Sequence, residues 1–135
     1  TRETAGAEMT KVVLEGVGCA LRDSREGAKS LGIHLERTKF CGGGAKSPLC
    51  KKMIANILNL KVDVIESEEG PAMGGAMLAA VACGEYASVE EIAEKFVKVT
   101  GTVEPDPELV AKYEDRYQKF RQIYPACRPL FEIIK

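Results

Sequence analysis

Residues Phe40 to Leu49 read FCGGGAKSPL and place three consecutive glycines and a Lys-Ser pair between two apolar stretches. Glycine-rich loops before a helix often bind phosphate, because their backbone N–H groups can approach the ligand closely. A Walker A loop requires G-x-x-x-x-G-K-[ST], but Ala45 and Phe40 stand where glycines are needed before Lys46 and Ser47. The spacing therefore excludes a P-loop.

The same stretch is a poor match to a dinucleotide-binding loop. A G-x-G-x-x-G pattern that begins at Gly42 and Gly44 has Ser47 at its third glycine position, and the nearby Gly16-Val17-Gly18 lies inside a helical pattern. Glycines at the carboxyl end of a parallel strand nevertheless occupy the place where open α/β sheets bind ligands. Two interpretations stay open: a side-chain-free bend under a flat ligand, or a tight turn without one.

Other residues capable of chemistry lack suitable spacing. His34, Cys41 and Cys50 do not have the spacing of zinc ligands, and the single histidine has no identifiable partner for a nucleophile relay. We therefore expect neither a metal site nor a catalytic residue in this chain. The five cysteines are scattered without a Cys-x-x-Cys pair, which predicts reduced and mostly buried thiols.

A strand and two helices are expected to position the glycine loop. Apolar residues at three- and four-residue steps predict a helix from Ala5 to about Lys29. Its expected buried face comprises Met9, Val12, Val13, Gly16, Val17, Ala20 and Leu21. A short strand is expected within residues 34–40, directly before the glycines. Ser47 as N-cap and proline after it predict a helix to about Leu58.

The residues after this helix indicate a parallel sheet. The β-branched residues Val62, Val64 and Ile65 predict a strand, and strand, helix, strand is the βαβ pattern. Gly70 and Pro71 open another helix. Its many small residues, which include Gly74 and Gly75, predict close packing on several sides, since interior glycines cost about 1 kcal/mol each in helix propensity.

Capping signals divide the last third of the chain. Ser88 and Glu91 form a capping box before a helix that extends to about Val97, and Gly101 is expected to end that region. Asp106 then begins an amphipathic helix, which Pro125 is expected to stop. A short helical tail is expected from residue 127.

Length and composition predict one globular domain over residues 1–135. The chain is 45% hydrophobic and 29% charged, with a formal net charge of -1, which gives no indication of a nucleic-acid or membrane partner. The longest apolar run, residues 76–83, is far shorter than the ~20 residues of a membrane span. We expect a cytoplasmic location. Because the sequence starts with Thr1, we expect a piece of a longer protein.

Several motifs in order resemble one family. The segments VLEGV at residues 13–17, ALRDS at 20–24, GGGAKSPL at 42–49 and EGPAMG at 69–74 resemble the C-terminal domain of the carbohydrate kinases that include xylulokinase, gluconokinase and glycerol kinase. The segments PDPE at 105–108 and YPA at 124–126 are similar to the xylulokinase branch. The resemblance covers nearly the whole chain, although Cys50 and Asn56 depart from residues common in xylulokinases.

The resemblance implies an α/β fold: the C-terminal part of a ribonuclease-H-like, actin-like ATPase domain, helix-rich with a small parallel sheet remnant. It also implies that Gly42, Gly43, Gly44, Ala45, Lys46 and Ser47 form the adenosine motif, beneath the nucleoside instead of around its phosphates. The strongest expectation falls on Gly43, Gly44 and Ser47. Lys46 is expected either over the nucleotide or in solvent.

The implied reaction is ATP-dependent phosphorylation of a sugar hydroxyl, with D-xylulose as the expected substrate and ATP with Mg2+ as cofactors. The catalytic Asp, the phosphate hairpins and the sugar-binding segments of the family are not found in this chain, so the polypeptide alone is expected to be inactive. The alternative is a non-catalytic binding or oligomerisation module without nucleotide dependence. A homodimer is compatible with both, because a two-stranded parallel sheet leaves an open edge.

Overall fold

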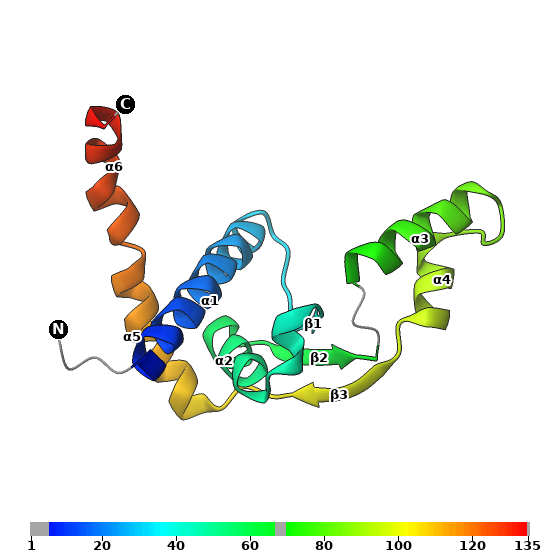
Figure 1. Cartoon of the computed structure of the whole chain (residues 1–135), viewed down its shortest axis with the longest axis horizontal. Helices are drawn as coiled ribbons and strands as arrows, with labels where there is room; N and C mark the ends of the chain where they lie inside the picture. The colour runs from blue at the N-terminus through cyan, green and yellow to red at the C-terminus, as the bar shows by residue number, and fades with distance from the viewer. Residues whose placement is uncertain (1–5, 67–69, 135) are drawn as a thin grey trace.

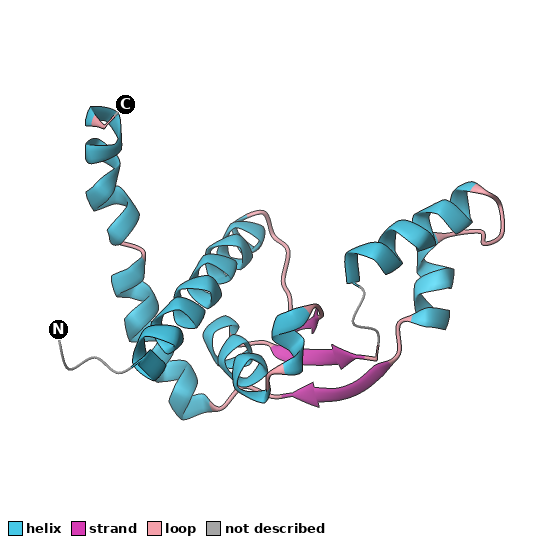
Figure 2. Cartoon of the chain, in the orientation of Figure 1, coloured by secondary structure: helices cyan, strands magenta, loops and turns pink. Residues whose placement is uncertain are grey.

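The computed structural model describes residues 6–66 and 70–134. Figure 1 shows its elements, which are α1 (Gly6–Ser30), β1 (Arg37–Phe40), the 3-10 helix η1 (Gly43–Lys46), α2 (Pro48–Leu58), β2 (Lys61–Ile65), α3 (Gly70–Ala82), α4 (Val89–Phe96), β3 (Val99–Val103), α5 (Pro107–Phe120) and α6 (Ile123–Ile133). Helices dominate, and the strands form one small sheet (Figure 2). The expected helix-rich α/β fold is confirmed.

The sheet has the order β1-β2-β3 and is mixed. Strand β1 pairs with β2 in parallel, as the βαβ pattern predicts, whereas β2 and β3 are antiparallel. The prediction that Gly101 ends a helical region is wrong, because this residue lies inside β3 opposite Val64. Its neighbours in the strand are valines and threonines, whose β-branched side chains favour extended backbone and outweigh one glycine.

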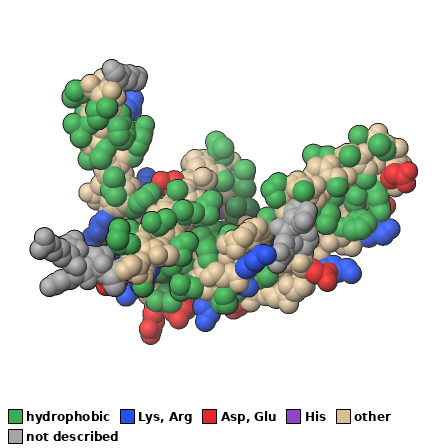
Figure 3. Space-filling view, viewed as in Figure 1, with side chains coloured by type: hydrophobic (Ala, Val, Ile, Leu, Met, Phe, Trp, Pro, Cys, Tyr) green, Lys and Arg blue, Asp and Glu red, His purple; other side chains and the backbone are tan. Residues whose placement is uncertain are grey.

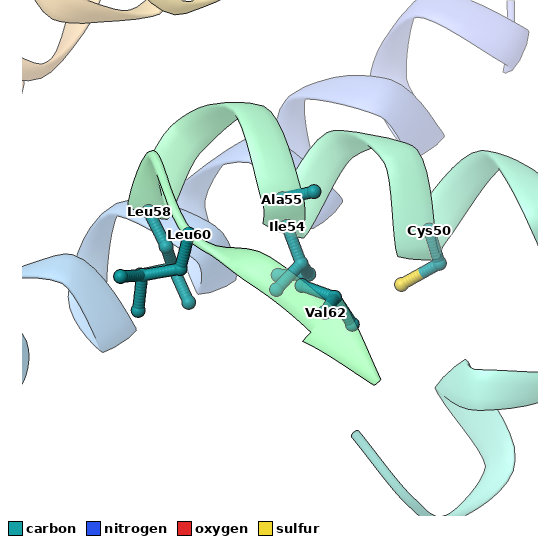
Figure 4. Close-up of a cluster of buried hydrophobic side chains, with 6 residues drawn as sticks. All are labelled: Cys50, Ile54, Ala55, Leu58, Leu60 and Val62. Carbon is teal, nitrogen blue, oxygen red and sulfur yellow. The ribbon is translucent and has the colours of Figure 1, made fainter. Parts of the chain in front are cut away.

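Helix α2 packs on β2 and forms the first part of the core (Figure 4). The buried side chains are Cys50, Ile54, Ala55, Leu58, Leu60 and Val62. Phe40 of β1 and Val103 of β3 border this cluster and are partly buried. Since α2 begins directly after the glycine loop, this packing fixes the loop relative to the sheet.

Helices α1 and α5 pack on the other side of α2. Their shared cluster contains Cys19, Met53, Ile57, Tyr113 and Tyr117. A Cβ atom on Gly18 would lie 2.6 Å from Cδ1 of Ile57, so the glycine permits close approach of α1 to α2. The helix pair therefore buries the side of α1 that carries Gly18.

The predicted buried face of α1 is wrong for this chain. Met9, Val12, Val13, Val17 and Leu21 are all exposed. Helix periodicity identified an apolar stripe, but α2 and α5 cover the neighbouring stripe. No described element packs over the first one.

The predicted N-caps of α2, α4 and α5 are confirmed, but one hydrogen bond of the predicted capping box has a different donor. Ser47 Oγ accepts from the Cys50 N–H at 3.3 Å and Ser88 Oγ accepts from the Glu91 N–H at 3.2 Å. The Glu91 carboxylate does not return to the N-cap residue but accepts from the Ala87 N–H at 3.0 Å. Asp106 caps α5, as its position before proline predicts.

The prediction that Pro125 stops the tyrosine-bearing helix is wrong. Helix α5 ends at Phe120, and Pro125 is the third residue of α6. A helix's first N–H groups have no partner within the helix, so proline is tolerated there. Figure 1 shows α6 projecting away from the rest of the molecule.

The close packing predicted around α3 is also wrong for the described residues. Only Met77 of this helix is buried, and a Cβ atom on Gly74 or Gly75 would meet nothing within 4 Å. Figure 3 shows hydrophobic side chains gathered over the α3–α4 region and over α6. Small residues permit a close neighbour, but they do not supply one.

The cysteines are free, but the prediction that most are buried is wrong. Cys19 and Cys50 are buried within the two core clusters, Cys41 and Cys83 are exposed, and Cys127 is half-buried. Cys41 follows an edge strand and Cys83 follows the thinly covered α3, so neither position receives a second layer of side chains among the described residues.

Because Tyr117 is buried, the stability of the fold is expected to fall at alkaline pH. Desolvation and the Asp23 carboxylate, whose Oδ1 lies 2.6 Å from the tyrosine hydroxyl, raise the pKa of Tyr117 to about 12 from 10.0. The folded state therefore holds this proton more tightly than the unfolded state. The resulting stabilisation is complete below about pH 10 and is lost as the pH rises through 12.

We expect the free energy of unfolding, measured with urea across this pH range, to fall more steeply in the parent chain than in Tyr117→Phe. Lysine deprotonation affects both proteins alike, so the difference isolates the phenol. Equal slopes for both proteins would contradict the assignment, as would an ultraviolet titration in which all tyrosines ionise together.

Candidate functional site

The glycine loop connects the carboxyl end of β1 to α2. Gly42 has φ 83° and ψ -172°, a conformation accessible essentially to glycine alone. Its carbonyl accepts from the Ala45 N–H at 3.0 Å, and the Gly44 carbonyl accepts from the Ser47 N–H at 3.2 Å. The loop is therefore a hydrogen-bonded 3-10 turn with a defined shape, not an irregular coil.

The three glycines present different surroundings. A Cβ atom on Gly42 or Gly43 would meet nothing within 4 Å, whereas one on Gly44 would lie 3.1 Å from Cζ of Phe40. Gly43 and Gly44 are both exposed, but a side chain at Gly44 would press on Phe40, whereas Gly43 leaves bare main chain next to open space. Gly42 and Gly43 are therefore the glycines whose main chain a flat ligand could touch.

A hollow of about 120 Å³ opens beside the loop. Its walls are formed by Cys41, Gly42, Ala45 and Lys46 on one side and by Val64, Ile65 and Glu66 on the other. The second group lies at and just after the carboxyl end of β2. The hollow thus lies at the carboxyl ends of both parallel strands, where α/β sheets bind ligands.

Val64, Ile65 and Glu66 were not among the site residues expected from the sequence. Their signal was present: in a parallel pair, the residue after the second strand reaches the same sheet edge as the residue after the first. Only the strand register brings them opposite the loop, with Phe40 beside Val64. Glu66 is the only carboxylate among the described residues that line this hollow.

Ser47 caps α2 and still has a hydroxyl hydrogen that can bind a ligand. Its Oγ accepts the Cys50 N–H as the cap of α2, which leaves its hydroxyl hydrogen free to donate elsewhere. The side chain of Lys46 lines the hollow and is exposed. Gly43, Gly44 and Ser47 do not line the hollow, so the structure brings together Gly42, Ala45 and Lys46 and sets the other three beside them.

The start of α3 reaches the same place. A Cβ atom on Gly70 would lie 2.5 Å from Sγ of Cys41, so the start of the helix lies against the Cys41 side chain at the end of β1. Glu69, the first residue of the EGPAMG segment, lies outside the described residues.

The polar groups of the site do not form a metal centre. Within residues 6–66 and 70–134, no three His, Cys, Asp or Glu side chains gather closely enough to hold a metal ion. His34 lies outside the loop, in the segment before β1. The described helices also include none that is long and apolar enough to cross a membrane.

Comparison with known proteins identifies the family. The model for the C-terminal domain of the FGGY family of carbohydrate kinases matches residues 1–83. The chain belongs to this family. Its FGGY segment includes α1, the glycine loop, the parallel strands and α3.

Relatives of this FGGY chain extend the similarity beyond residue 83. Xylulose kinase of Bacillus subtilis is 34% identical over 125 residues, which is 93% of this chain and 25% of that protein. Ribulokinase of Halalkalibacterium halodurans is 33% identical over 126 residues, 89% of this chain and 22% of that protein. The chain therefore spans about a quarter of the length of these relatives.

A solved structure confirms the fold of this FGGY chain. The xylulose kinase of Brucella ovis superposes with a TM-score of 0.79 at 30% identity, over 96% of this chain and 27% of that one. The resemblance to carbohydrate kinases and the actin-like ATPase fold expected from the sequence motifs are thereby confirmed.

Proposed function

We propose that this chain is the C-terminal, adenosine-binding part of a kinase that transfers the γ-phosphoryl group of ATP to a hydroxyl of D-xylulose. The single domain expected over residues 1–135 would then be one unit of a longer, cytoplasmic enzyme. The observation that carries the proposal is the bare main chain of Gly43 beside the hollow at the ends of β1 and β2, in a member of a carbohydrate kinase family.

The loop suits a nucleoside better than a phosphate chain. The hollow is small and mixed in polarity, and a Cβ atom at Gly43 would enter open space beside it, where we propose that the purine ring lies. Gly42 through Lys46 would supply the floor, and the hydroxyl of Ser47 can donate a hydrogen bond to the ligand. Lys46 would lie along the rim of the bound nucleotide.

Phosphoryl transfer also needs a metal ion and a general base. In such reactions, ATP supplies the phosphoryl group and Mg2+ neutralises phosphate charge, while a carboxylate takes the proton of the attacking hydroxyl. The residues of this hollow do not fit a Mg2+ site, so metal and general base would come from other parts of the enzyme. This chain's own residues would bind the nucleoside and orient it.

The identity of the sugar follows from relatives, not from the site. Both xylulose kinase and ribulokinase occur among proteins more than 30% identical to this chain. We favour D-xylulose because the segments PDPE and YPA at residues 105–108 and 124–126 are similar to xylulokinases.

Exposed apolar faces favour a second candidate function, a non-catalytic assembly module. Val12, Val13 and Val17 of α1 are each more than half exposed, and so are Tyr124 and Phe131 of α6. Strand β1 also forms an edge of the sheet. Such surfaces can pair two copies of the chain, giving a homodimer without nucleotide dependence.

Titration with ATP and an ATP-consumption assay with D-xylulose distinguish the two functions. We expect the chain to bind ATP weakly and saturably and to show no turnover, because the groups that act on the γ-phosphate lie elsewhere. Turnover by these 135 residues alone would contradict the proposal that the catalytic groups lie in other parts of the enzyme. Self-association without any ATP binding would support the assembly module instead.

A further inference from the structure

A second hollow, of about 320 Å³, lies between α1 and α5 and beside the end of α2. Its volume is at the lower end of the roughly 300–1,000 Å³ of small-molecule sites. The charged side chains that line it are Arg22, Arg25, Lys29 and Arg121, with Glu26 and Glu114. Four basic and two acidic groups leave a surplus of positive charge.

Both acidic groups are already engaged. Glu114 accepts hydrogen bonds from Arg22 and, at 2.6 Å, from the Gln118 amide, and these contacts lower the pKa of Glu114. Glu26 Oε1 lies 3.1 Å from Nη1 of Arg25. Lys29 and Arg121, by contrast, have no ion pair within 4 Å among the described residues, although the charge of Arg121 also acts on Glu114 and its guanidinium lies 5.8 Å from the centre of the Tyr117 ring. The unpaired charge of the hollow is therefore positive.

Arg22 provides the second, independent observation. The residue is only 7% exposed, yet its Nε and Nη1 atoms have no hydrogen-bond partner within the described part of the chain. Nε lies 3.8 Å from Glu26 Oε1, which is too long for a hydrogen bond. Unsatisfied buried N–H groups are rare in proteins and costly, more so when they are charged. Arg22 lines a cavity with excess positive charge, and these two N–H groups lie buried in its wall.

Helix dipoles explain only part of this arrangement. Lys29 is in the last turn of α1 and Arg121 is the C-cap residue of α5, where basic side chains complement the dipole. Arg22 lies two turns before the end of α1 and stacks on the Tyr117 ring, 4.1 Å from its centre. Its burial beside a polar cavity has no such explanation.

We propose that this hollow binds a phosphate group, either as inorganic phosphate or as part of a small phosphorylated sugar. Lys29 and Arg121 would contact the phosphate oxygens from the rim, and Arg22 would supply positive charge from the wall. The amides of Asn59 and Gln118 also line the hollow and can bond hydroxyl groups.

The site is separate from the glycine loop. The loop precedes α2 and Asn59 follows it, so the two hollows lie at opposite ends of a helix of 11 residues, about 16 Å long. Phosphate bound here would not be the phosphate chain of a nucleotide on Gly43. The inference therefore does not depend on the proposed kinase function.

The test is isothermal titration of the 135-residue chain with inorganic phosphate and, separately, with glucose 6-phosphate. Because an Arg22 variant breaks a buried ion pair and can unfold the protein, the test variant is Lys29→Met with Arg121→Gln. Lys119→Met is the matched control: it lies on α5, pairs with Asp115 and does not line the hollow.

We expect saturable binding of one phosphate group, weakened about tenfold or more in the double variant, because that variant removes two positive charges and their hydrogen-bond donors from the rim. Binding should be unchanged in Lys119→Met and in Gly43→Val. Tighter binding of glucose 6-phosphate would identify a sugar phosphate as the ligand, and equal affinities would identify phosphate itself. No saturable binding, or equal loss in the control, would overturn the proposal.

Discussion

Replacing Tyr117 with alanine is expected to lower the free energy of unfolding by about 3–5 kcal/mol, the range for removing a large buried ring. The side chain is 1% exposed and lies in the cluster that joins α1, α2 and α5. The Arg22 guanidinium also stacks on its ring, and its hydroxyl donates a hydrogen bond to Asp23 at 2.6 Å. Urea unfolding followed by circular dichroism measures the change.

Tyr124→Ala is the matched control, because Tyr124 is 65% exposed and lies in the projecting α6. We expect it to change the free energy of unfolding by no more than about 0.5 kcal/mol. Tyr117→Phe should fall between the two variants, since it keeps the ring and loses one hydrogen bond. Similar losses in both alanine variants would contradict the core described for α1, α2 and α5.

Gly43→Val is expected to weaken ATP binding at least about tenfold, equivalent to 1.4 kcal/mol or more. The open space beside Gly43 means that valine fits the folded protein without a clash, so stability should hardly change. The added methyl groups would stand where the nucleoside is proposed to rest. Ligand-observed NMR, which detects weak complexes, measures the affinity in the chain.

Gly27→Val is the control for this prediction. Gly27 lies in α1 and does not line the hollow, and a Cβ atom there would also meet nothing within 4 Å. We expect its ATP affinity to equal that of the parent chain. If Gly43→Val binds ATP as the parent does, the loop is not the nucleoside floor and the proposed function fails with it.

The parts of the fold that were predictable depend on local chemistry. Ser47 before proline, Asp106 before proline and the β-branched residues of β2 each act on their immediate neighbours, so the starts of α2 and α5 and the parallel pair were correct. The glycine loop was also located correctly between strand and helix. Whether it binds a nucleoside remains a prediction.

The errors concern features that depend on distant residues. Strand β3 contains a glycine and forms because β2 lies beside it. Pro125 stands in the first turn of a new helix, a position that local sequence does not reveal. The stripe of α1 that contains Val12 and Val13 is as apolar as a buried face, but burial depends on what packs against it.

The sequence by itself determined where the capped helices α2, α4 and α5 and the strand β2 begin, which family the chain resembles and which loop lacks side chains beside a helix start, because caps, β-branching and missing Cβ atoms act over a few residues. Only the tertiary structure decided which face of α1 is covered, that Glu66 shares the hollow of the glycine loop, and that Arg22, Lys29 and Arg121 line one other hollow. Those neighbours come from segments far apart in the chain, and their positions follow from helix packing and strand register.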